Sequence, residues 1–81
     1  MRLDLCLKHS GLLKNREAAK YYCERKLVKV NGEVKKATAK IKSGDLIEIY
    51  LGKLIAFYVY IEDKGNVKEV TYKLAGKNYD A

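Results

Sequence analysis

The sequence predicts an α+β domain in which two short helices precede a small, mostly antiparallel β-sheet. Three observations support this fold class. Apolar residues recur with helical spacing in the first quarter of the chain, and they alternate with polar residues from Val28 onward. Between the first two alternating segments, Asn31-Gly32 is the strongest two-residue signal for a β-hairpin. A chain of 81 residues has room for a single domain.

The first helix is expected to start near Leu3 and to end at Gly11, which suits a C-terminal cap. Its inward positions follow the i, i+3, i+4, i+7 rhythm of an amphipathic helix and are Leu3, Cys6, Leu7 and Ser10. We expect Cys6 and Cys23 to be reduced, buried thiols, because no secretory signal precedes them. Cys6 and His9 have a ligand-like spacing but too few partners for tetrahedral zinc, so no metal site and no cofactor is predicted.

The second helix is expected from Arg16 to about Arg25. Asn15 is a good N-cap, because its side-chain oxygen can accept a hydrogen bond from an unpaired backbone N–H group of the first turn. The inward stripe consists of Ala18, Ala19, Tyr22 and Cys23. Arg16 and Lys20 are four residues apart, so they share the opposite, solvated face of the helix.

The sheet is expected to begin with a hairpin in which Val28 and Val30 alternate with Lys29 and Val34 starts the return. Further strands are predicted at 46–51, 54–61 and 67–74. In the strand 54–61, Tyr58 and Tyr60 lie on the less apolar face, where they either stack on unpaired bases or only cover the edge of the sheet. The predicted organisation is a domain over 1–50, a C-terminal β-hairpin over 51–74 and a frayed tail over 75–81.

Several classes of function are disfavoured by the same sequence. The longest apolar stretch has eight residues, far fewer than the roughly 20 that a membrane-spanning helix needs. No nucleophile with a base, acid–base pair or metal set is evident, so we expect no enzyme and no small-molecule substrate. We expect a cytoplasmic protein that acts as a monomer without a membrane partner.

Positive charge is concentrated in one part of the chain. Between Lys14 and Lys42 there are ten Lys and Arg residues and three Glu residues, so this window carries a net charge of +7, equal to that of the whole chain. A compact cationic surface on a small domain attracts polyanions, because each neutralised phosphate releases condensed counterions. The charge pattern therefore predicts a protein that binds nucleic acid.

Four ordered blocks of the chain resemble the RNA-binding domain named after ribosomal small-subunit protein four, the S-four domain. The blocks are Arg2-Leu3-Asp4, Gly11-Leu12-Leu13-Lys14-Asn15-Arg16-Glu17-Ala18-Ala19-Lys20, Val28-Lys29-Val30-Asn31-Gly32 and Gly44-Asp45-Leu46-Ile47-Glu48-Ile49. They span about residues 2 to 50. The resemblance implies the two-helix RNA-binding arrangement of that family, called the alpha-L motif.

The short length and the C-terminal hairpin make the chain similar to a narrower group, the stand-alone bacterial S-four proteins of the ribosome-associated heat-shock and ribosome-quality-control type. That similarity implies binding to ribosomal RNA of the large subunit while it carries peptidyl-tRNA, with contacts to the tRNA.

The chain departs from the family at three positions. Lys26 stands where glycine is common, and Leu5 stands where a basic residue is frequent. Asn15 stands where Ser or Thr is common, which is harmless because Asn caps a helix equally well. At the position of Lys26, a left-handed backbone would strain a lysine, or the loop has another shape and presents Lys26 to RNA.

RNA contact requires cations fixed on a rigid surface, because proteins recognise RNA helices through their shape, phosphates and 2′-hydroxyls. Arg16 is the strongest candidate, since its planar guanidinium can bind a phosphate through two hydrogen bonds. For Arg2, pairing with Asp4 or Asp45 is an equal alternative to RNA contact. The resemblance places the second helix and the Lys29 to Lys36 hairpin on the RNA-facing side. The predicted RNA-binding residues are Arg2, Lys14, Arg16, Lys20, Lys29, Lys35, Lys36 and Lys40.

Two rival functions remain open. In the first, the chain is an accessory module that binds a protein through the sheet face of Tyr58 and Tyr60. In the second, it is a less specific cationic domain that binds structured RNA outside the ribosome, DNA or anionic membranes. The RNA-binding hypothesis requires that folding gathers the basic residues of the first half of the chain onto one continuous face.

Overall fold

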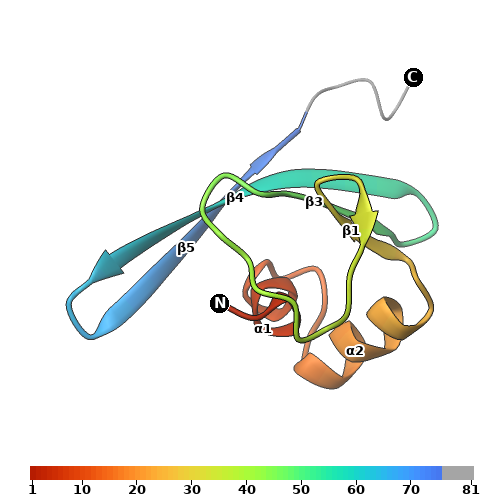
Figure 1. Cartoon of the computed structure of the whole chain (residues 1–81), viewed down its shortest axis with the longest axis horizontal. Helices are drawn as coiled ribbons and strands as arrows, with labels where there is room; N and C mark the ends of the chain where they lie inside the picture. The colour runs from red at the N-terminus through yellow and green to blue at the C-terminus, as the bar shows by residue number, and fades with distance from the viewer. Residues whose placement is uncertain (76–81) are drawn as a thin grey trace.

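A computed structural model of the chain describes residues 1–75 and consists of two helices followed by one five-stranded sheet (Figure 1). The helices are α1 (Leu3–His9) and α2 (Arg16–Glu24). The strands are β1 (Val28–Val30), β2 (Glu33–Val34), β3 (Leu46–Tyr50), β4 (Leu54–Lys64) and β5 (Val67–Leu74). Their order in the sheet is β2-β1-β3-β4-β5, and all neighbours are antiparallel. The predicted α+β fold is confirmed.

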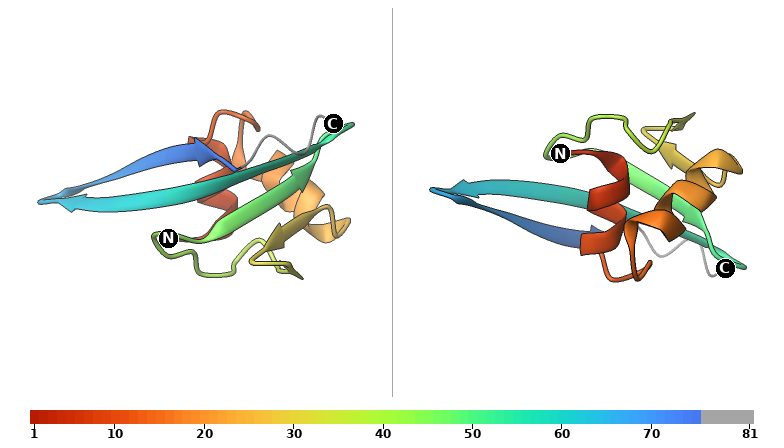
Figure 2. Two further views of the ribbon diagram at one scale, coloured as in Figure 1. Left: turned by 90° about the horizontal axis from the view of Figure 1, so that it is seen from above. Right: turned by 90° about the horizontal axis from the view of Figure 1, so that it is seen from below.

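Both helices lie on the same face of the sheet, and the core fills the space between them and the strands (Figure 2). From α1, Leu3, Cys6 and Leu7 are fully buried, as the helical spacing predicted. The sheet contributes alternate residues, because successive side chains of a strand point to opposite faces. Its buried inward residues are Val28, Val30, Ile47, Ile49, Phe57 and Val59.

The helix termini follow the sequence signals closely. The Asn15 side chain accepts a hydrogen bond from the N–H of Ala18 at 2.8 Å and thereby caps α2. Ala19 and Cys23 are buried, and both Cys6 and Cys23 are free thiols. Gly11, just after α1, has a φ of +81°, a left-handed conformation that glycine adopts without a Cβ clash.

The turn between β1 and β2 does more than reverse the chain. Asn31 and Gly32 have φ values of 52° and 86°, as expected for this two-residue hairpin. The Asn31 side chain also donates to Asp45 Oδ1 at 3.1 Å and accepts from the N–H of Leu46 at 3.0 Å. The other Asp45 oxygen accepts from the N–H of Lys42 at 2.8 Å. These bonds fasten the tip of the hairpin to the start of β3.

The segment after β2 runs along the N-terminus of the chain. The N–H of Leu3 donates to the carbonyl of Ala39 at 2.8 Å, and the N–H of Asp4 donates to that of Ala37 at 3.0 Å. The N–H of Ile41 donates to the carbonyl of Met1 at 2.7 Å. The basic residues of this loop are therefore held beside the start of α1.

The C-terminal hairpin of β4 and β5 extends well beyond the helices (Figure 1). Strand β4 continues to Lys64, three residues past its predicted end. The prediction of a frayed tail from residue 75 is wrong for Ala75, which is buried and donates its N–H to the carbonyl of Ala56 at 2.9 Å. The remainder of the predicted tail, 76–81, lies outside the described residues. Within residues 1–75, no helix has the length and apolar character needed to cross a membrane.

Candidate nucleic-acid interface

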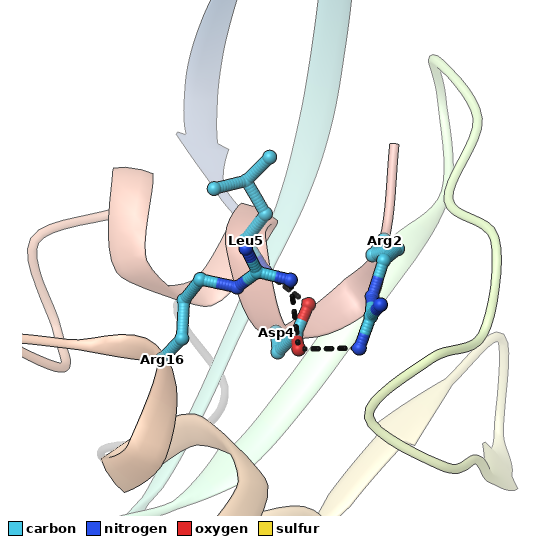
Figure 3. A network of polar contacts seen from close by, with 4 residues as sticks. All are labelled: Arg2, Asp4, Leu5 and Arg16. Atoms are coloured by element: carbon cyan, nitrogen blue, oxygen red, sulfur yellow. Dashed lines mark hydrogen bonds and ion pairs between the residues drawn. The ribbon is translucent and has the colours of Figure 1, made fainter.

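Two arginines meet at one buried carboxylate. Asp4 in the first turn of α1 is only 1% exposed, and its Oδ2 atom lies 3.0 Å from Nη2 of Arg2 and 3.5 Å from Nη2 of Arg16. Figure 3 shows the two guanidiniums approaching Asp4 from opposite sides, one from the N-terminal segment and one from α2. The other carboxylate oxygen accepts from the N–H of Leu5 at 2.7 Å. Of the two pairings considered for Arg2, the structure contains the one with Asp4.

This arrangement positions two cations without neutralising both. A carboxylate removed from water must be paired and hydrogen-bonded, because its desolvation is otherwise costly. One negative charge serves two positive ones, so the cluster keeps a net charge of +1. The side chains of Arg2 and Arg16 remain 49% and 46% exposed. Each guanidinium therefore has donors left for an external anion.

A second group of cations surrounds a groove of about 590 Å³ between α2 and the loop that follows β2. Its rim carries four lysines and one carboxylate, namely Lys20, Lys26, Lys35, Lys36 and Glu24. The other lining residues are mainly apolar, namely Cys23, Val34, Ala37 and Thr38. Three of the predicted residues, which are separated by up to 16 positions in the sequence, thus lie around one concavity.

The groove and the arginine pair belong to one surface that follows α2. Arg16 and Lys20 are one helical turn apart on the same face of α2. The loop that carries Lys35 and Lys36 continues to Lys40, which forms an isolated β-bridge with Arg2. Lys14 is exposed immediately before the N-cap of α2 and extends the surface beyond Arg16. This surface, from Lys14 along α2 to Lys26 and across the loop to Lys40, is called the helix-side basic surface below.

Lys29 does not belong to this surface, which corrects the expectation of one continuous face. Val28 and Val30 are buried toward the helices, so Lys29 between them points to the opposite face of the sheet. There it lies across from Glu48 of β3 and lines a second groove of about 260 Å³, which shares Lys26 with the first. The alternation of the strand correctly predicted that Lys29 is exposed, but it gave no indication of which face the helices cover.

The remaining cations differ in how far they are already paired. Lys35 forms an exposed ion pair with Glu33 at 3.2 Å, which weakens its attraction for other anions only modestly. Within residues 1–75, no ion pair involves Lys14, Lys20, Lys26, Lys36 or Lys40. Arg25 is directed elsewhere, because its guanidinium carbon lies 4.2 Å from the ring centroid of Tyr21.

The sequence suggested Asp4 only as a partner of Arg2, and its second pairing with Arg16 was not expected. A signal for Asp4 was present. It stands beside Leu3 and three residues before Leu7, on the inward side of α1, where a carboxylate requires a partner. Lys26 could not be placed from the sequence, since its direction depends on how α2 ends.

The part of the chain that carries the basic surface also matches a known family of domains. The family model of the S4 domain matches residues 1–47. These residues contain α1, α2 and the whole helix-side basic surface, including the loop up to Lys40.

Curated relatives extend the similarity to the whole fold. The chain is 43% identical over 74 residues to the "RQC P-site tRNA stabilizing factor" of Halalkalibacterium halodurans, which covers 90% of this chain and 78% of that protein. It is 35% identical over 69 residues to the protein of the same name from Streptococcus pneumoniae, covering 85% and 78%. The protein of that name from Helicobacter pylori is 36% identical over 62 residues, covering 76% and 74%.

Proposed function

The chain belongs to the S4 domain family, and from this premise we propose that it is an RNA-binding factor that stabilises tRNA in the P site of the ribosome during ribosome quality control. The single observation that carries the proposal is the helix-side basic surface, which coincides with the part of the chain that the S4 domain matches. The name of the relatives specifies the P-site tRNA. We propose the large subunit as the docking site, and a monomer that acts by binding alone, without catalysis, in the cytoplasm.

The chemistry of the surface suits structured RNA. Side chains cannot reach the base edges in the deep major groove of an RNA helix, so a protein recognises its phosphates and overall shape. The pair of Arg2 and Arg16 is held about Asp4 and can bind one phosphate between two guanidiniums. The lysines around the groove, about one helical turn further along α2, can contact successive phosphates of the same strand. A protein fixed on ribosomal RNA in this way would slow the departure of a tRNA that it also contacts.

A test of the site should remove charge without disturbing Asp4. Substituting Arg16 by Glu would place a second carboxylate beside a buried one, so the fold itself would be at risk. Lys20 and Lys36 are exposed and make no ion pair within residues 1–75, which makes the double variant Lys20→Gln and Lys36→Gln the suitable one. The control is Lys64→Gln with Lys68→Gln, which removes the same charge from the tip of the β4–β5 hairpin. It also breaks the exposed ion pair of Lys64 with Glu69 at 3.0 Å, which contributes little to stability.

The measurement uses large subunits that carry a labelled peptidyl-tRNA. We expect the wild-type protein and the hairpin variant to co-sediment with these subunits and to slow dissociation of the tRNA. The variant of Lys20 and Lys36 should bind at least about tenfold more weakly, because two phosphate contacts are lost, while its thermal unfolding is nearly unchanged. Equal binding by the two variants would exclude the helix-side basic surface as the site. An unchanged tRNA dissociation rate despite binding would exclude the stabilising role.

A further inference from the structure

The face of the sheet opposite the helices carries two neighbouring exposed tyrosines. In β4, Phe57 and Val59 are buried toward the helices, so Tyr58 and Tyr60 point away from them. These two side chains are 37% and 40% exposed. The strand register places Lys73 of β5 directly across from Tyr58, and Thr71 across from Tyr60. Neither helix covers this side of the sheet (Figure 2).

The two rings are not explained by packing within the described part of the chain. Tyr72 shows what a structural tyrosine does in this fold. Its ring packs edge-on against Phe57, with centroids 5.5 Å apart, and its hydroxyl donates to the carbonyl of Cys6 at 3.0 Å. Among residues 1–75, the hydroxyls of Tyr58 and Tyr60 have no hydrogen-bond partner, and neither ring pairs with another aromatic ring.

The spacing of the two rings matches a ligand with repeated flat groups. Residues two apart on a strand are about 6.6–6.8 Å apart, so adjacent rings on this face can each receive one of two consecutive unstacked bases. Lys73 beside Tyr58 provides a cation for the intervening phosphate. On the same face, Glu48 lies across from Lys29, and the paired Glu62 and Glu69 lie one step beyond Tyr60. These carboxylates limit the positive charge of the face, so stacking should supply more of the affinity here than phosphate attraction does.

We propose that this face of the sheet, centred on Tyr58 and Tyr60 with Lys73 beside them, binds a single-stranded RNA segment by stacking two of its unpaired bases. The contact is separate from the helix-side basic surface and does not depend on it. With both surfaces occupied, the protein would hold a structured RNA on one side of the sheet and unpaired nucleotides on the other.

The test uses an unstructured oligouridine of about ten nucleotides as the probe. The chain has seven tyrosines and no tryptophan, so its intrinsic fluorescence reports on tyrosine rings. We expect the oligonucleotide to quench this fluorescence on binding. Replacing either ring, as Tyr58→Ala or Tyr60→Ala, should raise the Kd by about 5-fold to 150-fold, the usual effect of losing one stacked base. The conservative variants Tyr58→Phe and Tyr60→Phe should keep the affinity, because a phenyl ring also stacks, but should show less quenching.

The double variant Lys20→Gln and Lys36→Gln separates this proposal from the proposed function. It should bind large subunits at least about tenfold more weakly and keep its affinity for the oligouridine. If that variant loses oligouridine binding while the alanine variants of the tyrosines keep it, the single strand lies on the helix side and the proposal is wrong. The proposal is equally wrong if the wild-type chain does not bind the probe. The alanine variants are also tested for binding to ribosomal proteins after nuclease treatment. If they lose a contact of that kind and still bind the oligouridine, the face binds a protein and the proposal is overturned.

Discussion

At the scale of single residues, Lys26 has two roles that oppose each other. It follows Arg25, the C-cap of α2, with a φ of 62°, and the N–H groups of Lys26 and Leu27 donate to the carbonyls of Cys23 and Tyr22 at 3.0 Å each. This is the hydrogen-bond pattern of a Schellman motif, in which glycine is the usual residue because a Cβ is strained there. The lysine side chain, however, lines the basic groove. Lysine at this position therefore lowers the stability of the fold somewhat, while its ammonium group adds a cation to the interface.

Lys26→Gly should raise the free energy of unfolding by up to about 1 kcal/mol, because it relieves the strain of the left-handed conformation. The larger backbone entropy of glycine in the unfolded chain offsets part of this gain. For a chain of this size, this corresponds to an increase in Tm of roughly 4–8 °C per kcal/mol. Thermal unfolding followed by circular dichroism measures the change. Lys26→Ala is the matched control, because it removes the same ammonium group and keeps the Cβ. Equal Tm values for the two variants would show that the backbone is not strained at this position.

At the scale of elements, local signals predicted the helices and turns, whereas contacts between distant segments could not be read from the sequence. The cap at Asn15 and the backbone conformation of the Asn31-Gly32 turn depend on residues within a few positions of each other, so they could be predicted from the sequence. The bonds of the Asn31 side chain to Asp45 and Leu46 could not. The hydrogen bonds of the 35–41 loop to the N-terminus use backbone groups only, and no side-chain pattern encodes them. The prediction that Lys29 shares one face with the other basic residues is wrong for the same reason, since packing decides which face of the sheet the helices cover.

The interface of the helices with the sheet buries both thiols, which makes the stability of this element sensitive to alkaline pH. Burial raises the pKa of Cys6 and of Cys23 from the ordinary value of 9.0 to about 11. Below pH 9 the thiols are protonated in the folded and unfolded states, and their contribution to stability is fully present. Above it the unfolded chain releases protons that the folded chain retains, so unfolding becomes more favourable.

We therefore expect the free energy of unfolding to fall between about pH 9 and pH 11, with a slope of up to about 1.4 kcal/mol per pH unit for each thiol. Denaturant titrations at a series of pH values would measure this slope. The double variant Cys6→Ala and Cys23→Ala should be less stable at neutral pH, because it leaves small cavities. Its stability should nevertheless fall less steeply with pH. An identical slope in that variant would assign the alkaline sensitivity to other groups.

At the scale of the whole molecule, the charges are segregated between the compact body and the projecting hairpin. The described chain measures 40 × 27 × 21 Å, and the β4–β5 hairpin forms its long end (Figure 1). The distal part of the hairpin, residues 62–69, contains Glu62, Asp63 and Glu69 but only two lysines, Lys64 and Lys68. The positive charge that the sequence concentrates before residue 43 thus stays on the body, where the helices and the 35–41 loop orient it. A polyanion would therefore approach the protein from the helix side.

This segregation predicts how strongly salt should weaken binding to ribosomal RNA. If five cations of the helix-side basic surface each contact a phosphate, the plot of log K against log salt concentration should have a slope of about −4, from 0.7–0.9 per contact. Lys20→Gln with Lys36→Gln should make this slope shallower by about 1.4–1.8. Lys64→Gln with Lys68→Gln should leave it unchanged, because their charges lie on the hairpin and make no phosphate contact. Binding isotherms for a large-subunit RNA fragment at several salt concentrations would measure all three slopes. A similar decrease for both double variants would mean that the RNA senses only the net charge of the chain, and that the ordered surface along α2 does not determine where it binds.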